Sequence, residues 1–220
     1  MKPRFRILLM AKILLFDWWG TLVNNGTYSP LRQTYQLLRP RMKFGDFVHR
    51  FEDVFMTQRF ETQEEAFHSV FDALNVRPKA FVMDKLIGIW NKNRLLGQEY
   101  EDTAQALAQL KTDYTLVLCT NAECFLETIF DKFDWMNLFD KKFLSYEAGE
   151  LKQSGALITH AITELGAQPA DVIYIGDSIE TDIEGAQAAG IRAILVDRKG
   201  RREYDDKVAN LLDLPGYLNE

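Results

Sequence analysis

Four short apolar runs along the chain predict buried strands, because each is only a few residues long and rich in β-branched or aromatic residues. The runs are apolar at consecutive positions, a pattern typical of strands that are covered by helices on both faces. They therefore predict a parallel sheet. The runs are ILLF at 13–16, YTLVLCT at 114–120, VIYIGD at 172–177 and AILVD at 193–197.

Apolar residues recur at helical spacing before and between the last three of these runs. Ala106, Leu107 and Leu110 fall on one helical face, and the segment SGALITHAITELG at 154–166 keeps this period until Gly166 ends it. Alternation of strands and helices is typical of α/β folds with a parallel sheet. We therefore expect a doubly wound, Rossmann-like core.

Between roughly Asn24 and Gly97 the strand signal disappears, and Phe and Leu recur at helical spacing. The simplest interpretation is an α-helical domain at 24–97, inserted into a core that consists of 1–23 and 98–220. The insertion is rich in phenylalanine, which we expect to form a small hydrophobic core of its own rather than a ligand site. The phenylalanines expected in this core are Phe44, Phe47, Phe51, Phe55, Phe60, Phe67 and Phe71.

Composition changes this picture little. The 220 residues are 47% hydrophobic and 26% charged and carry a net charge of -6, which is typical of a soluble globular protein and argues against a nucleic-acid partner. No apolar run reaches the length of a membrane span, so no membrane partner is expected. Cys119 and Cys124 are not spaced like zinc ligands, and we expect a reducing, cytoplasmic location.

The N-terminal segment is basic and then apolar, as in a secretory signal peptide. Lys12 interrupts the apolar run and no small-residue cleavage site follows. We therefore expect no signal peptide, and Met10 offers an alternative start to Met1.

Polar side chains stand where three of the predicted strands end. Asp17 follows ILLF, Thr120 ends the second run, and Asp177 ends the third. Taken singly, an Asp or Thr at such a place often caps a turn or the next helix. Ligands of open α/β sheets, however, bind outside the carboxyl ends of the strands. We therefore expect these three side chains to converge on one crevice.

The motifs at these positions resemble the four motifs of the haloacid dehalogenase-like hydrolase superfamily, in the same order, from Ile13 to about Asp197. The placement of the helical insertion is similar to the mobile helical cap of subfamily I, as in phosphoglycolate phosphatase-like members. The fold implied is a Rossmann-like core with a helical cap. The motifs are Asp17-x-x-Gly20-Thr21, Thr120-Asn121, Lys152 before a helix, and Gly176-Asp177-Ser178-Ile179-Glu180-Thr181-Asp182.

The resemblance assigns catalytic roles to three residues. Asp17 would be the nucleophile that forms a covalent aspartyl intermediate. Thr120, with Asn121 and the backbone amides that follow, would hold phosphoryl oxygens. Lys152 would neutralise charge on the nucleophile and on the transferred group.

The resemblance also implies a magnesium site, since oxygen ligands suit this hard cation. Asp17, Asp177 and the backbone carbonyl of Trp19 would hold the ion, and Trp19 would also contact substrate. Asp182 would orient the acidic loop or Lys152. Thr21 would hydrogen-bond the loop of the nucleophile. The neighbouring Trp18 we interpret as a wall of the crevice or as a contact to the cap.

Trp19 departs from the pattern of the phosphatases in this superfamily, which carry a second Asp two residues after the nucleophile. That Asp serves as general acid and base, and an indole can do neither. Dehalogenases have Tyr at this position, and phosphonoacetaldehyde hydrolases, whose motif is similar to D-W-A-G-T, also need a Schiff-base lysine in the cap. None of the candidate cap lysines follows a pattern that matches it: Lys43, Lys79 and Lys85.

If the site is a phosphatase, a residue other than Trp19 would have to supply the proton. The candidate donors are His49, Glu64, Glu65 and His68 in the insertion and Glu123 beside the second motif.

A second, smaller departure from the family pattern is Gln153, which stands where the superfamily usually has a proline after the lysine.

Three hypotheses follow. The first is a magnesium-dependent phosphatase for a small phosphorylated metabolite, slowed by Trp19 and acting as a monomer or a homodimer. The second is a protein that binds a phosphorylated ligand without turnover. The third is a hydrolase of carbon–halogen or carbon–phosphorus bonds, which the metal-binding arrangement of Asp177 and Asp182 disfavours for dehalogenation.

Overall fold

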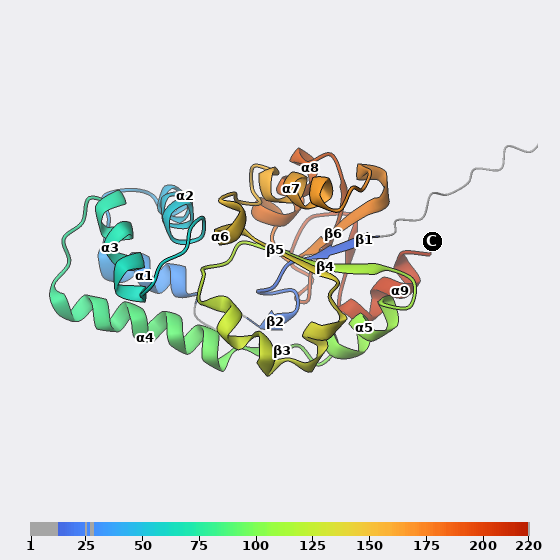
Figure 1. Ribbon diagram of the computed structural model, residues 1–220, viewed down its shortest axis with the longest axis horizontal. Helices are drawn as coiled ribbons and strands as arrows, with labels where there is room; N and C mark the ends of the chain where they lie inside the picture. Colours follow the sequence, from blue (N-terminus) through green and yellow to red (C-terminus); the bar gives the residue numbers. More distant parts are fainter. Residues whose placement is uncertain (1–12, 25, 27–28, 220) are drawn as a thin grey trace, which may run out of the picture.

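Six parallel strands form the central sheet of the structure, a computed structural model that describes residues 13–24, 26 and 29–219 (Figure 1). Their order across the sheet is β5-β4-β1-β6-β7-β8. The four predicted strands are confirmed and occupy neighbouring places as β4, β1, β6 and β7. The strands are β1 (Ile13–Phe16), β4 (Thr115–Thr120), β5 (Lys141–Leu144), β6 (Val172–Gly176), β7 (Arg192–Val196) and β8 (Lys207–Val208).

Helices cover both faces of this sheet, as the apolar runs predicted (Figure 1). Alternate residues of β1 enter two separate hydrophobic cores: Leu14 and Phe16 pack on one face and Leu15 on the other. The doubly wound α/β core is therefore confirmed. The helices are α5 (Thr103–Leu110) and α9 (Leu214–Tyr217) on one face, and α7 (Ala156–Glu164) and α8 (Glu184–Ala188) on the other, with α6 (Ser145–Ala148) after β5.

Two strands at the edges were not predicted from the sequence. β5 begins with the exposed residues Lys141 and Lys142, and β8 has only two residues. Edge strands face solvent on one side and need no continuous apolar run. The pattern that identified the central strands is therefore missing from both.

Among the described residues, the insertion forms four helices around a separate hydrophobic core, which confirms the role expected for the seven phenylalanines named above. Phe47, Phe51, Phe55, Phe67 and Phe71 are buried in it, while the other two pack against it. We call this unit the cap; it consists of α1 (Pro30–Leu38), α2 (Phe44–Phe55), α3 (Gln63–Ala73) and α4 (Ala80–Leu96).

Two chain segments connect the cap to the core, and they pair with each other. β2 (Val23–Asn24) and β3 (Gln98–Glu99) form a short antiparallel ribbon next to the expected domain limits. Direct hydrogen bonds also link the two units: Ser145 Oγ donates to the carbonyl of Met56 at 2.5 Å, and Arg59 Nη2 lies 2.7 Å from Glu147 Oε1. The cap is thereby held over the carboxyl ends of the strands.

Trp18 is a core residue, so the expectation that it lines the crevice or contacts the cap was wrong. Its side chain is fully buried, and its ring lies 5.1 Å from that of Phe130 and 5.5 Å from that of Trp135, centroid to centroid. The reason is the two-residue period of a strand, which continues past β1 and places Trp18 on the same face as Leu14 and Phe16.

Among the residues that the structure describes, none of the helices combines the length and the apolar character needed to cross a membrane. The N-terminal features, Lys12 and the alternative start at Met10, lie outside the described residues.

Candidate active site

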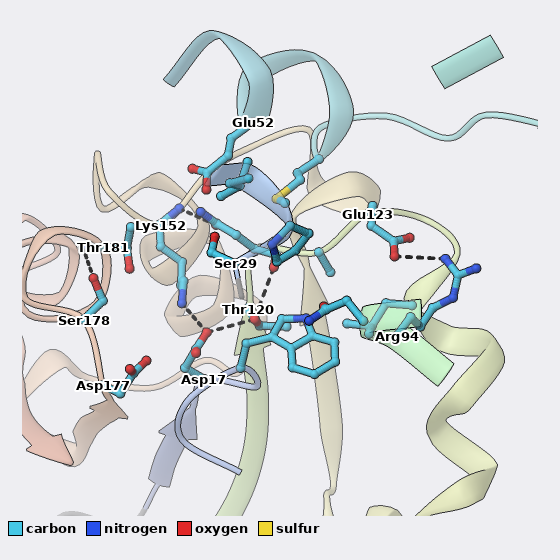
Figure 2. Close-up of a pocket in the computed structure, with 18 of the residues that line it drawn as sticks. Asp17, Ser29, Glu52, Arg94, Thr120, Glu123, Lys152, Asp177, Ser178 and Thr181 are labelled. Atoms are coloured by element: carbon cyan, nitrogen blue, oxygen red, sulfur yellow. Dashed lines mark hydrogen bonds and ion pairs between the residues drawn. The ribbon is translucent and has the colours of Figure 1, made fainter. Parts of the chain in front are cut away.

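A pocket of about 460 Å³ lies between the carboxyl ends of β1, β4 and β6 and the cap (Figure 2). The structure brings the three predicted strand-end residues together in it, along with the other predicted substrate-contacting residues. From the core, these residues are Asp17, Trp19, Thr120, Asn121, Lys152 and Asp177. From the cap, the lining includes Arg32, Glu52, Trp90 and Arg94.

Asp17 is held by two side chains from distant parts of the chain (Figure 2). Thr120 Oγ1 donates a hydrogen bond of 2.9 Å to Asp17 Oδ1, and Lys152 Nζ contacts the same oxygen. Lys152 Nζ also lies 2.5 Å from Asp182 Oδ1. Asp17, Lys152 and Asp182 are all buried. An acid is therefore tolerated at the end of a buried strand because its charge is paired.

Burial governs the ionisation of these groups. It raises the pKa of Asp17 to about 6, although Lys152 acts in the opposite direction. Burial, and then repulsion by Asp182 and Asp17, raises the pKa of Asp177 to about 7. Burial by itself would lower the pKa of Lys152, but the two adjoining carboxylates raise it above its ordinary value. Lys152 is therefore a cation at neutral pH.

Three carboxylates gather at this point, close enough together to hold a cation. One oxygen each from Asp17, Asp177 and Asp182 lies within 4.8 Å of the others. Gly20 has a left-handed φ of +86°, and a Cβ there would collide with the carboxylate of Asp177. The loop that carries the Trp19 carbonyl therefore lies directly against Asp177. The negative charge of three carboxylates exceeds the single positive charge of Lys152. Such a set of oxygen ligands fits a hard divalent cation.

The loop after β6 is shaped by its own side chains. Ser178 accepts a hydrogen bond of 3.3 Å from the amide of Thr181, which caps a π-helical turn at Ile179–Ile183. The amide of Ser178 donates to Asp182 Oδ2 at 3.0 Å. A Cβ at Gly176 would collide with the Asp182 carboxylate. Asp182 does not itself line the pocket but connects this loop to Lys152.

A chain of amide hydrogen bonds links the second motif to the cap. The backbone amide of Lys152 donates to Asn121 Oδ1 at 2.9 Å, and Asn121 Nδ2 donates to Gln153 Oε1 at 2.8 Å. Gln153 Nε2 in turn donates to Glu52 Oε2 at 2.7 Å. Asn121 therefore lines the pocket and also fixes the loop that presents Lys152.

Trp19 and Thr21 lie on the loop that follows β1. The Trp19 ring lines the pocket and packs against Gly97, where a Cβ would lie 3.0 Å from the indole. Gly97 directly follows α4, so Trp19 contacts the connection between cap and core. The Thr21 hydroxyl is buried and has no hydrogen-bond partner among the described residues, so the bond expected from it is not observed.

The candidate proton donors are placed unequally. Glu123 lines the pocket but forms a buried ion pair with Arg94, with 3.1 Å between Oε1 and Nη1. His49 lines a separate groove. The remaining candidates from the cap do not line the pocket, and neither do the candidate lysines Lys43, Lys79 and Lys85. Sequence reasoning missed Glu52, which is 6% exposed, lines the pocket and has its pKa raised by burial.

Comparisons with known proteins place this geometry in context. The chain matches a model of the haloacid dehalogenase-like hydrolase family over residues 11–190. It is 29% identical over 141 residues to N-acylneuraminate-9-phosphatase of Mus musculus, an alignment that covers 59% of this chain and 56% of that protein. The chain thus spans about half the length of the curated relatives it matches.

Solved structures with a similar fold include a 2-haloacid dehalogenase of Pseudomonas syringae pv. Tomato DC3000, with a TM-score of 0.65 at 20% identity, covering 96% of this chain and 99% of that one. A HAD phosphatase of Thermococcus onnurineus gives a TM-score of 0.61 at 21% identity, covering 94% of this chain and 97% of that one. At these identities the likeness concerns the fold alone.

Proposed function

Because the chain belongs to the haloacid dehalogenase-like hydrolase family, we propose that it is a magnesium-dependent phosphatase that acts on a small phosphorylated metabolite. The observation that carries the proposal is the cluster around Asp17: a buried carboxylate held by Lys152 and Thr120, beside two further acids, of which Asp177 lines the pocket. Curated relatives that include phosphatases add support.

In the proposed reaction, Asp17 attacks the phosphorus atom and forms an aspartyl-phosphate. Lys152 and Thr120 both bind Oδ1, so we assign Oδ2 as the attacking oxygen. Lys152 offsets negative charge on the nucleophile and on the transferred group, and Thr120 and Asn121 position the phosphoryl oxygens. Trp19 forms an apolar wall beside the substrate.

The residues present fit a magnesium ion. Asp17, Asp177 and the carbonyl of Trp19 would hold it, and its charge would offset that of the phosphoryl oxygens. Asp182 would stay with Lys152 and the Ser178 amide and keep the acidic loop in place.

We also propose that the chain consists of two domains, a core of 1–23 and 98–220 and a cap of 24–97. In this scheme the cap, through Arg32, Glu52 and Arg94, contacts the part of the metabolite beyond its phosphate. A cytoplasmic monomer or homodimer remains our prediction.

A screen of phosphate esters with and without magnesium tests the function. We expect inorganic phosphate to be released from at least one alkyl or sugar phosphate, and the release to stop in excess chelator. Ester binding without any release would favour a binding protein instead. Halide release from a 2-haloacid, without phosphate release from any ester, would favour carbon–halogen chemistry.

Asp177→Asn tests the metal site separately from turnover. Ligand binding stabilises a folded protein, so saturating magnesium should raise the melting temperature of the wild type by roughly 5–10 °C. The variant should lose this shift. In chelator it should be at least as stable as the wild type, because one of three clustered carboxylates has lost its charge.

Thermal denaturation in magnesium and in chelator measures both effects. Glu180→Gln, an exposed acid in the same loop, serves as the matched control and should keep the full shift. An equal magnesium shift in Asp177→Asn and the wild type would contradict the site.

A further inference from the structure

We propose that Glu52 of the cap is the general acid and base of this site and supplies the proton transfers that Trp19 cannot. This inference rests on the phosphatase activity proposed above. It assigns a catalytic role to a residue outside the four motifs, on a helix that contributes none of them.

The position of Glu52 relative to Asp17 is the first argument. Asp17 lies at the core end of the pocket and Glu52 on the cap, with the pocket between them (Figure 2). In phosphoryl transfer the attacking and leaving oxygens lie roughly in line on opposite sides of phosphorus. A phosphoryl group that Asp17 attacks from the core therefore has its leaving oxygen directed toward the cap. The water that later releases the phosphate approaches from that same side.

The bonding of the other acids is the second argument. Four carboxylates line the pocket, and three of them face a cation. Asp17 is paired with Lys152, Glu123 with Arg94, and Asp177 lies 3.8 Å from Arg202. Glu52 instead accepts from the neutral amide of Gln153, which occupies its Oε2.

The surroundings of Glu52 are the third argument. Its side chain is buried, and burial raises its pKa above the ordinary value. The hydrogen bond from Gln153 and the ionisable side chains of Lys152 and His49 oppose this rise, and Asp53 on the same helix adds to it. A raised pKa brings a carboxyl group closer to the range in which it both donates and accepts a proton.

Gln153 explains how the carboxylate is held. Its amide donates to Glu52 and accepts from Asn121, so the cap carboxylate is tied to the loop that presents Lys152. A proline has no side-chain donor for this contact. The two departures of this sequence from the family pattern, Trp19 and Gln153, therefore have one explanation: an acid was lost on the core side and another is held in place from the cap.

The proposed steps balance. As Asp17 attacks phosphorus and the phosphorus–oxygen bond of the ester breaks, the carboxylic acid of Glu52 gives its proton to the leaving oxygen and becomes a carboxylate. That carboxylate then takes a proton from water, whose oxygen attacks phosphorus as the bond to Asp17 breaks. Inorganic phosphate and the Asp17 carboxylate are released, and Glu52 is again protonated.

Glu52→Gln, which keeps the shape and a hydrogen-bond acceptor for Gln153, tests the proposal with two esters. Turnover of an alkyl phosphate should fall by about 10²- to 10⁴-fold, because both the acid and the base are removed. With p-nitrophenyl phosphate the leaving group needs no proton, so the variant should release nitrophenolate in a burst and then stall as the aspartyl-phosphate. Rapid-quench assays and intact-protein mass spectrometry measure the burst and the phosphoenzyme.

Matched controls separate chemistry from structure. Asp46→Asn removes another acid of the same helix, which is exposed and does not line the pocket, and it should leave both activities unchanged. Wild-type turnover of both esters by Glu52→Gln, within about threefold, would overturn the role of Glu52 and leave the phosphatase assignment intact. If Glu52→Gln lost turnover of both esters equally and showed no burst, the role of Glu52 would also be overturned, because that pattern indicates only a displaced cap. No phosphate release by the wild type from any ester would overturn both proposals.

A second variant pair keeps the test independent of Glu52→Gln alone. Introducing Trp19→Asp into the Glu52→Gln protein should raise its turnover of the alkyl phosphate at least about tenfold, because a positioned acid–base group is present again. The burst with p-nitrophenyl phosphate should then disappear. Trp19→Asn in the same background opens a similar space but transfers no proton. Equal turnover of the two double variants would count against the proposal.

Discussion

Replacing Asp17 by asparagine is expected to abolish turnover of every phosphate ester and to prevent any covalent phosphoenzyme from forming. The amide oxygen of asparagine is neutral and cannot form the acyl phosphate, so the loss should be on the order of 10⁴-fold or more. Rapid-quench trapping and mass spectrometry detect the intermediate, and a phosphate-release assay measures the turnover.

The same variant should keep its fold, which makes the result interpretable. Asparagine can still accept from Thr120 and Lys152 through its oxygen, and Lys152 keeps its partner Asp182. Burial already disfavours the charge on Asp17, as the rise of its pKa to about 6 indicates, so removing that charge costs little. Thermal denaturation should give a melting temperature close to that of the wild type. Turnover above the contaminant level in a folded Asp17→Asn protein would exclude Asp17 as the nucleophile.

The core of the fold follows from local sequence because its central strands are buried on both sides. Runs such as ILLF and VIYIG are apolar at consecutive positions, which favours strands that are covered on both faces, and parallel strands carry their terminal residues to one edge. That is why Asp17, Thr120 and Asp177 could be placed together in advance. The edge strand β5 lacked such a run, because solvent covers part of it.

The cap side of the pocket could not be predicted in the same way. The docking of the cap on the core decides which cap residues reach the site. Helical periodicity in the sequence indicates only which face of each helix is apolar, so it does not identify these residues. Glu52 did leave a signal: it lies between the buried residues Phe51 and Phe55, on the edge of the apolar face of α2. A carboxylate buried at such a position must either be protonated or form a hydrogen bond or ion pair with a residue across an interface. The partner, Gln153, follows only from the tertiary structure.

The error at Trp18 has the same kind of cause. Two adjacent indoles after a strand offered two candidates for the pocket wall, and the alternation of strand side chains decides between them. Even-numbered residues of β1 enter the core shared with α5, so Trp18 continues that row and Trp19 is left to face the pocket.

Lys152→Met is expected to lower the free energy of unfolding at pH 8 by about 3–5 kcal/mol, which corresponds to a fall in melting temperature of roughly 6–20 °C. The lysine is 2% exposed and is the cation shared by Asp17 and Asp182, so its removal leaves two buried carboxylates side by side without a counter-charge. Turnover should be lost as well, because the clamp on the transferred group is gone.

The pH dependence of this loss has a definite sign. An acid whose pKa is raised in the folded state holds its proton more tightly there than in the unfolded chain, so its burial destabilises the protein increasingly as pH rises toward the folded pKa. Asp17 has a pKa of about 6 even with Lys152 present, so below pH 6 it is mostly neutral. The deficit of Lys152→Met should therefore be largest at pH 8 and shrink toward pH 5. Chemical denaturation across this range measures it.

Lys152→Met/Asp182→Asn is the control that ties the loss to charge rather than to packing. Asparagine keeps one oxygen for the amide of Ser178 and removes one of the two stranded charges, so the double variant should regain part of the stability at pH 8. A cavity left by the lysine stem would give a loss that neither pH nor Asp182→Asn reduces. A Lys152→Met protein within about 1 kcal/mol of the wild type at pH 8 would show that the two carboxylates do not depend on this cation, and the electrostatic account of the site would fail.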